Sequence, residues 1–282
     1  MLTATSSRRT TSDVRRELVA VNTAPDSENR MHGDEAARYG FSSGLVPGVD
    51  VLGYLAHAAV ERWGADWLGE GRLDGRLVAP VYDGETVTIT GDGPSSTALD
   101  AEAVGPDGSV RATAGLTRID DDGQGRVAGL ISAAEPEIGV LPDPDDRPPA
   151  SRELLEPGTV LGTQWATFHA EKAGHYLDEI SKDHPAFRQD GLAHPGWLLR
   201  FSNWALSRTV RLGPWIHVAS DAWFLGPVHD GDRIEVRARI TDRFERKGHE
   251  LVDLAVVYDV GERIVAYVDH RAIWQPRTGE ST

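Results

Sequence analysis

Hydrophobic and polar positions along the chain predict two apolar helices, each followed by strands. Apolar residues at helical spacing predict a long helix over 49–67, and a matching apolar stretch lies within 191–215. Alternation of apolar and polar residues predicts strands after the first helix, and the turn over 105–108, Gly-Pro-Asp-Gly, joins two of them in a hairpin. A long helix followed by antiparallel strands is typical of an α+β unit in which the sheet wraps around the helix.

The second half of the chain repeats the first. The stretch that begins at Pro80, Pro-Val-Tyr-Asp-Gly-Glu-Thr-Val, returns at Pro227 as Pro-Val-His-Asp-Gly-Asp-Arg-Ile. The pair Pro47-Gly48 returns as Pro195-Gly196. Because these anchors recur in the same order, each copy has a helix, a turn, a strand and a hairpin. Two such units in one chain are expected to pair side by side, as two copies do in a homodimer of the single unit.

This repeat sets the expected domain organisation. Residues 120–158 contain DDDGQG and DPDDRPP with no hydrophobic period, which predicts a linker running over the surface. The Ser/Thr-rich N-terminus is expected to be disordered. The expected organisation is therefore a tail over 1–12, a first repeat over 13–119, an acidic proline-rich linker over 120–158, a second repeat over 159–277 and a tail over 278–282.

Composition and charge narrow the functional classes. The 282 residues are 40% hydrophobic and 26% charged, as in ordinary globular proteins. The absence of cysteine excludes disulfides, thiolate nucleophiles and cysteine-ligated metals. A net charge of −15 without a long basic cluster argues against nucleic acid and anionic membranes as partners. No apolar run is long enough to span a membrane and the N-terminus lacks a signal-peptide core, so we expect a cytoplasmic protein.

A polar turn and a glycine-punctuated loop, Gly40 to Gly48, precede the first long helix. Their residue order resembles the MaoC-like (R)-specific enoyl-CoA hydratase/dehydratase family, whose motif is roughly Asp-x-Asn-Pro-x-His-x-Asp, then Ala, Gly-Phe, and His-Gly at the helix start. The matching residues here are Asn29, His32, Asp34, Ala37, Gly40-Phe41 and Gly48. The Pro-Val-x-x-Gly-acidic turn also matches, in both copies. The resemblance implies a double hot dog, with two long central helices each wrapped by an antiparallel sheet.

The chain departs from this motif at the position of the catalytic aspartate. The family's Asp falls on Ser27, with Asp26 and Glu28 on either side. Arg30 stands in place of the family's Pro, and Pro47 in place of the His of His-Gly. What replaces the carboxylate is therefore left open by the sequence.

The second copy of the motif is degenerate. The Asp falls on Lys182, the Asn on His184 and the His on Phe187, although His194 is kept before the second helix. Since both acid/base positions are lost, the second repeat is expected to shape the substrate pocket while the first does the chemistry.

The resemblance implies a cofactor-free lyase that adds water to, or removes it from, an acyl thioester on CoA or an acyl carrier protein. His32 would be the acid/base, because its unperturbed pKa lies near neutrality. Ser27, Asn29 or Asp26 would orient the water. The N–H groups of Gly48 and Val49 would form the oxyanion hole, because helix N-termini carry unpaired donors.

Pro47, His194 and Gly196, at the two helix starts, complete the predicted substrate-binding set. A small-molecule thioester is thus the expected partner, and a homodimer is compatible with the sequence. Two alternatives stay open. A divergent isomerase or cyclase would use the same fold, and a non-catalytic protein would hold an acyl or other apolar ligand in the pocket.

Each candidate residue also has a structural interpretation. Asn29 is as well suited to bonding its own turn, and Asp34 to capping the short helix predicted over 35–39. His194 could simply mark a helix entry.

Two other motifs are set aside. The pattern Gly-x-Ser-x-Gly around Ser42 lacks the preceding strand and following helix of a nucleophile elbow. The pair His32-x-Asp34 lacks a second ligand pair for a metal.

Overall fold

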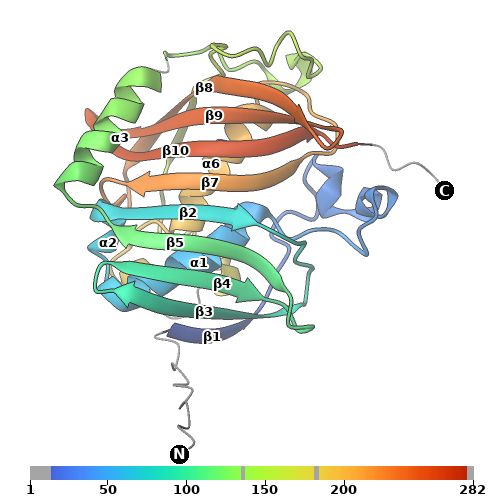
Figure 1. The fold of residues 1–282 in the computed structure, drawn as a ribbon. Helices are drawn as coiled ribbons and strands as arrows, with labels where there is room; N and C mark the ends of the chain where they lie inside the picture. The colour runs from blue at the N-terminus through green and yellow to red at the C-terminus, as the bar shows by residue number, and fades with distance from the viewer. Residues whose placement is uncertain (1–13, 135–136, 181–183, 278–282) are drawn as a thin grey trace, which may run out of the picture.

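The computed structural model describes residues 14–134, 137–180 and 184–277, and the two predicted tails lie outside the described residues. The described residues form one ten-stranded antiparallel sheet (Figure 1). Its strands are β1 (Val14–Val19), β2 (Gly71–Leu77), β3 (Thr86–Ser95), β4 (Ala98–Val104), β5 (Val110–Arg118), β6 (Gln164–Thr167), β7 (Ile216–Phe224), β8 (Arg233–Arg246), β9 (His249–Val260) and β10 (Arg263–Gln275).

The strand order shows the internal repeat. It runs β1-β3-β4-β5-β2-β7-β10-β9-β8-β6, so corresponding strands of the two repeats lie at equal distances from the centre. The repeats meet where β2 pairs with β7, with Asp74 opposite Asp221. The predicted hairpin over the Gly105–Gly108 turn is confirmed as β4 and β5. The α+β architecture of two paired helix-and-sheet units is likewise confirmed.

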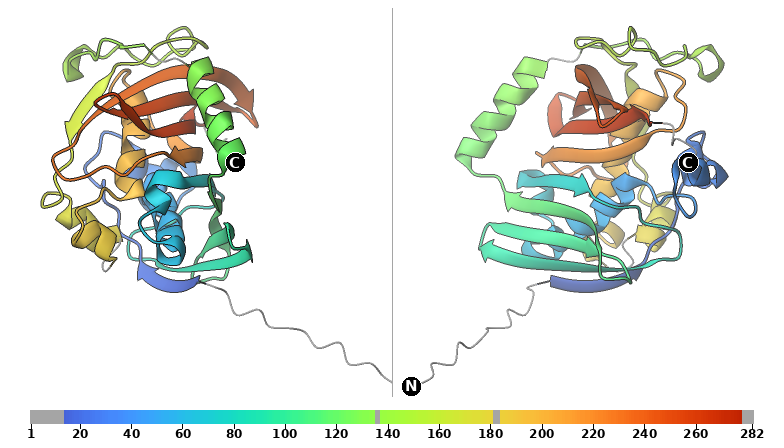
Figure 2. Two further views of the ribbon diagram at one scale, coloured as in Figure 1. Left: turned by 90° about the vertical axis from the view of Figure 1, so that its left-hand side faces the viewer. Right: turned by 45° about the vertical axis from the view of Figure 1, so that its right-hand side comes forward.

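Two central helices, α1 (Gly48–Trp63) and α6 (Pro195–Ser207), lie on the concave face of the sheet and pack against each other (Figure 2). They approach so closely that a Cβ atom on Gly53 would lie 3.2 Å from the Cα of Gly196. Most of α1 is buried, because the sheet covers one side and α6 the other. The two repeats therefore share one hydrophobic core.

The first helix is shorter than the sequence pattern predicts. It ends before Gly64, whose φ of +76° favours glycine, and the separate helix α2 (Trp67–Glu70) follows. The short helix predicted over 35–39 is a 3₁₀ helix, η2 (Asp34–Tyr39). Its N-cap position is Gly33, so the expectation that Asp34 caps it is wrong. The remaining short helices are η1 (Arg30–His32), η3 (Pro144–Asp146), α4 (Gly174–Ile180) and α5 (Pro185–Arg188).

The expected linker contains a regular helix that the sequence pattern does not indicate. Helix α3 (Asp121–Ala134) lies on the sheet face opposite α1 and α6 (Figure 2). Val127 and Ala134 are buried there in a second cluster with Trp223, Val257 and other residues of the sheet. The stretch that connects the repeats thus covers part of the outer sheet face, because its few apolar residues meet apolar residues of the second repeat. No helix in the described ranges is both long and apolar enough to cross a bilayer.

Candidate functional site

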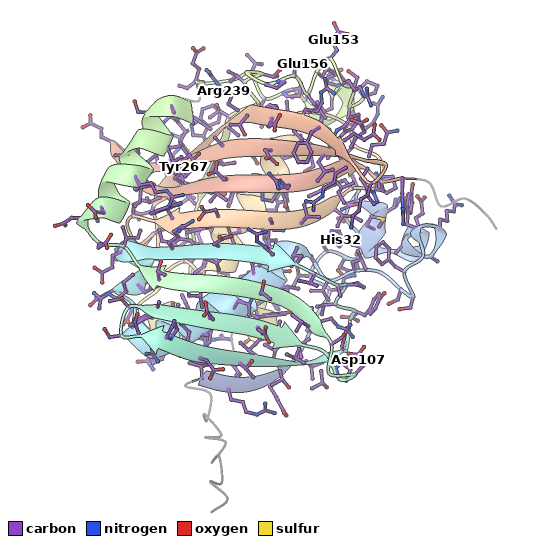
Figure 3. The ribbon with its side chains drawn as sticks, viewed as in Figure 1. His32, Asp107, Glu153, Glu156, Arg239 and Tyr267 are labelled. Carbon is purple, nitrogen blue, oxygen red and sulfur yellow. The ribbon has the colours of Figure 1, made fainter. Side chains whose placement is uncertain are left out.

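His32 lies on η1, near one end of the central strands (Figure 3). Its Nδ1 atom is 2.7 Å from the carbonyl oxygen of Leu45. A carbonyl only accepts hydrogen bonds, so Nδ1 carries the proton and donates it. This bond joins the turn that holds His32 to the loop that leads into α1, and it leaves Nε2 as the unprotonated, hydrogen-bond-accepting nitrogen of the neutral ring.

Asn29 supports the same assignment from the other side of the ring. Its Oδ1 accepts hydrogen bonds from the N–H groups of Met31 and Trp215, at 3.2 and 3.3 Å. Its Nδ2 donates to the carbonyl oxygen of Trp215, at 3.0 Å. These bonds fix the amide orientation, so Nδ2, 3.3 Å from Nε2 of His32, is a donor to that nitrogen. The neutral His32 ring therefore has an acceptor at Nε2.

The surroundings favour the neutral form of His32. Burial lowers the pKa of His32 below the ordinary histidine value, and the hydrogen bond to Leu45 opposes this shift in part. At neutral pH the ring is therefore predominantly uncharged. A neutral imidazole can take a proton from water at Nε2 once the water replaces the Asn29 amide as the donor to that nitrogen.

Two cavities meet at His32. The first, of about 280 Å³, is called the polar cavity here, and its polar lining includes Ser27, Glu28, Arg147, Arg200, Ser207 and Arg208. The second, of about 190 Å³, is called the apolar cavity, and its lining includes Phe41, Val51, Leu77, Val81, Ile216 and His217. Four residues line both: Asn29, His32, Asn203 and Trp215. A molecule with one polar and one apolar part could therefore occupy both cavities with its middle beside His32.

The start of α1 lies at the same junction. Pro47 occupies the N-cap position, and Pro47 and Val49 line the polar cavity while Gly48 lines the apolar one. Proline has no polar side-chain atom, so the helix start has no side-chain cap. The helix N–H groups of Gly48 and Val49 make no hydrogen bond to any described residue. Gly48 is tightly enclosed, because a Cβ atom there would lie 2.2 Å from Leu77 Cδ1 and 2.9 Å from His217 Nδ1.

A scan against protein-family models found no match, and neither did a search of curated proteins. Solved structures do share the architecture. A MaoC-like dehydratase aligns with a TM-score of 0.59 at 13% identity, over 93% of this chain and 98% of its own. A conserved hypothetical protein from Mycobacterium tuberculosis, which has a double hot-dog fold, aligns with a TM-score of 0.57 at 13% identity, over 92% and 93%. An acyl-CoA thioesterase II from Mycobacterium marinum aligns with a TM-score of 0.50 at 15% identity, over 83% of this chain and 90% of its own.

The fold is a double hot dog. The MaoC-like resemblance of the sequence is matched by this structural similarity to a MaoC-like dehydratase. The turn holding His32 lies beside the start of α1 because η2 and the loop after it fold back, so that Leu45, just before α1, accepts the hydrogen bond from His32.

Of the residues at and beside the position of the family's aspartate, Ser27 and Glu28 line the polar cavity and Asp26 is exposed to solvent. Ser27 lines the polar cavity, and its hydroxyl donates to the carbonyl oxygen of Asn29 at 3.3 Å. Asp26 is exposed and lines neither cavity. Glu28 lines the polar cavity but forms an ion pair with Arg147, at 2.8 Å, and this hydrogen bond lowers the pKa of Glu28. None of these positions therefore places a free carboxyl group at the junction of the two cavities.

The second helix start of the double hot dog is not brought to this site. His194 is buried at the N-cap of α6, where its Nδ1 accepts from the N–H of Gly196 at 3.1 Å. That donor is therefore already used, and neither residue lines the two cavities at His32. The degenerate motif has become structural: His184 caps α5 and Phe187 is buried, while Lys182 lies outside the described residues.

Sequence reasoning missed two groups at the site. Asn203, on α6, lines both cavities. In the second group, Ser220 Oγ lies 2.9 Å from His217 Nε2 and 3.0 Å from His270 Nδ1, and all three residues are buried. Burial lowers the pKa of His217 to about 4, so this ring is neutral. Buried polar residues in apolar surroundings were the available signal, but only the fold shows which of them meet the cavities.

Proposed function

We propose that this protein adds water to an enoyl thioester, or removes it from a 3-hydroxyacyl thioester, with His32 as the acid/base. The observation that carries the proposal is the position of a neutral His32. Its Nδ1 donates to Leu45, and the ring lies where a cavity with several charged side chains and a more apolar cavity meet the start of α1. The similarity to a MaoC-like dehydratase and to an acyl-CoA thioesterase supports acyl thioester chemistry in general.

In the hydration direction, a water oxygen attacks C3 of the enoyl group while one water proton passes to Nε2 of His32. Electrons of the double bond move toward the thioester oxygen, which gains enolate charge. The N–H groups of Gly48 and Val49 would donate to that oxygen. His32 then returns its proton to C2, so the 3-hydroxyacyl product forms and the ring is neutral again. Dehydration follows the same steps in reverse.

The cavities suggest how the substrate would lie. The apolar cavity would receive the acyl chain, because Val51, Leu77 and Ile216 offer apolar surface. The polar cavity would receive the carrier side of the thioester. The start of α1 has no side-chain cap, so the N–H groups of Gly48 and Val49 would be open to the thioester oxygen.

The experiment compares the wild type with His32→Ala on enoyl- and 3-hydroxyacyl-CoA substrates of increasing chain length. Removal of a general acid/base lowers kcat by about 10²–10⁴-fold. The control is His229→Ala, because His229 is an exposed histidine that lines neither cavity, and it should keep wild-type activity. Release of free CoA is measured in parallel. A fully active His32→Ala variant would refute the proposal, and CoA release without enoyl conversion would show a thioesterase instead.

A further inference from the structure

Asn203 is a buried amide at the junction of the two cavities. It lies on α6, so it comes from the second repeat, and only 9% of its surface is exposed. It lines both cavities together with His32, Asn29 and Trp215. Its Oδ1 atom is buried and has no hydrogen-bond partner among the described residues. A buried acceptor without a partner destabilises a fold, so this amide calls for an explanation outside packing.

The neighbouring polar groups show how unusual this is. Asn29, the other amide at the junction, uses both of its amide atoms in hydrogen bonds. Ser27 donates its hydroxyl proton to a backbone carbonyl. Ser202, which precedes Asn203 on α6, is paired with the hydroxyl of Tyr258 at 2.7 Å. Asn203 Oδ1 and His217 Nδ1 are thus two buried polar atoms beside the apolar cavity that lack a partner among the described residues, and only Asn203 also lines the polar cavity.

The first repeat shows that packing does not require an amide at this place in a central helix. Counted from Pro47-Gly48 as Asn203 is counted from Pro195-Gly196, the corresponding residue of α1 is Leu55. Leu55 is fully buried. A larger apolar side chain thus fills the equivalent position of the first repeat, where no amide is needed.

We propose that Asn203 is a catalytic residue that binds the water which adds to C3, or the 3-hydroxyl group which leaves it. This inference rests on the proposed function. An amide offers both N–H donors and an acceptor, so it can hold the water oxygen while a water proton points to Nε2 of His32. The second repeat then supplies the polar partner that Ser27, in place of the family's aspartate, does not. Because an amide does not ionise, His32 is left as the single proton-transferring group.

The test uses Asn203→Leu, which imitates the first repeat, and Asn203→Asp, which keeps the shape and adds a carboxyl group. For Asn203→Leu we expect kcat to fall about 10²-fold, as for the loss of one oriented donor. Its KM should change little, and its Tm should not fall. For Asn203→Asp we expect retained activity with a second ionisation in the acid limb of the pH profile. The control is Ser202→Ala, which breaks the bond to Tyr258 and should lower Tm while leaving kcat unchanged.

Each outcome decides the matter. A lower Tm with wild-type kcat in Asn203→Leu would assign Asn203 a structural role and overturn the inference. If Asn203→Leu does not fold, the Asn203→Asp profile decides, and an unchanged single ionisation overturns the inference. Wild-type protein that converts no enoyl or 3-hydroxyacyl thioester would overturn the proposed function and the role of Asn203 together. Wild-type turnover with an unaffected Asn203→Leu variant would overturn only the role of Asn203.

Discussion

At the scale of single residues, the chemistry of the site depends on which nitrogen of His32 carries the proton. Leu45 accepts from Nδ1, and Asn29 donates toward Nε2. Both contacts select the same tautomer, and burial keeps the ring neutral. The second repeat has Phe187 at the corresponding position, so the two halves of the molecule differ in acid/base capacity although their folds correspond.

The protonation state of His32 predicts the pH dependence of hydration. A base must be neutral, so activity is lost as the pH falls through the pKa of His32. Because burial lowers that pKa, we expect kcat/KM to stay level through neutral pH and to decline only below about pH 6.5, the ordinary histidine value. The measurement is kcat/KM against pH, with circular dichroism at each pH to establish that the chain is folded. An acid limb centred above the ordinary value would contradict the account.

Part of the site could be predicted from local sequence. His32, Asn29 and the N–H groups of Gly48 and Val49 belong to one continuous stretch whose spacing follows a known motif. Asn203 could not be found in this way, because its role depends on which face of α6 meets the first repeat. His194 misled the prediction for the same reason, since its side chain caps α6 and does not open into the cavities.

At the scale of elements, the start of α1 has to serve two purposes. It packs against β2 and β7 through Leu77 and His217, and the N–H groups of Gly48 and Val49, which bond to no described residue, belong to residues that line the cavities. A side chain at position 48 would require Leu77 or His217 to move. The geometry of the proposed oxyanion hole is therefore coupled to the packing of this helix.

Replacing Gly48 by Ala tests this coupling. The new methyl group would collide with Leu77 and His217, so the helix start or the Leu77 side chain must move. We expect a loss of about 1–3 kcal/mol in the free energy of unfolding, as for other overpacked sites. We also expect kcat to fall at least about tenfold. Denaturant unfolding and steady-state kinetics measure the two effects.

Gly129→Ala is the matched control, because Gly129 lies in α3 and an added Cβ atom would meet nothing within 4 Å. Removing a helical glycine should raise the free energy of unfolding by about 0.5–1 kcal/mol and leave kcat unchanged. A Gly48→Ala variant with wild-type stability and kcat would show that the helix start tolerates a side chain. It would contradict the predicted coupling between helix packing and the oxyanion hole.

Helix α3 also shows a limit of prediction at this scale. Its sequence, DDGQGRVAGLISAA, contains three glycines and few apolar residues, so it has little helical propensity of its own. Its packing against Trp223 and Val257 supplies the missing stabilisation. Those contacts come from β7 and β9, which lie far later in the chain, so no local sequence pattern reveals them.

At the scale of the whole molecule, an ion pair between a buried aspartate and a partly exposed arginine joins the two repeats. Asp50 of α1 is completely buried, and it is bonded to Thr23 and Tyr176 and paired with Arg200 of α6 at 3.3 Å. Burial raises the pKa of Asp50, and the Arg200 charge opposes that shift. The repeat itself was predictable, because its anchors recur in the same order. This polar link was not, because Asp50 and Arg200 occupy different positions in the two copies.

Arg200→Met should therefore destabilise the molecule in a pH-dependent way. It leaves the buried Asp50 without its cation, which costs about 3–5 kcal/mol at neutral pH. Without the Arg200 charge, the pKa of Asp50 rises further in the folded state. The Asp50 carboxyl group therefore binds its proton more tightly in the folded chain than in the unfolded chain. The loss should shrink as the pH falls toward 5 and grow as it rises. Denaturant unfolding across this range measures it.

Two further variants control this prediction. The double variant Asp50→Asn with Arg200→Met removes both charges and should recover most of the lost stability. Arg15→Ala breaks an exposed pair with Glu17 and should change stability by less than about 0.5 kcal/mol. A loss in Arg200→Met that does not depend on pH would mean that the Asp50 charge is not its cause.

The proposed function requires that water adds to C3 of an enoyl thioester at His32. It is tested most directly by incubating the wild type with an enoyl-CoA in ¹⁸O-labelled water and locating the label by mass spectrometry. We expect ¹⁸O in the 3-hydroxyl group of an intact thioester, and incorporation at that position about 10²–10⁴-fold slower with His32→Ala. Label in the carboxylate of a released acid, or no label in either product, would contradict it.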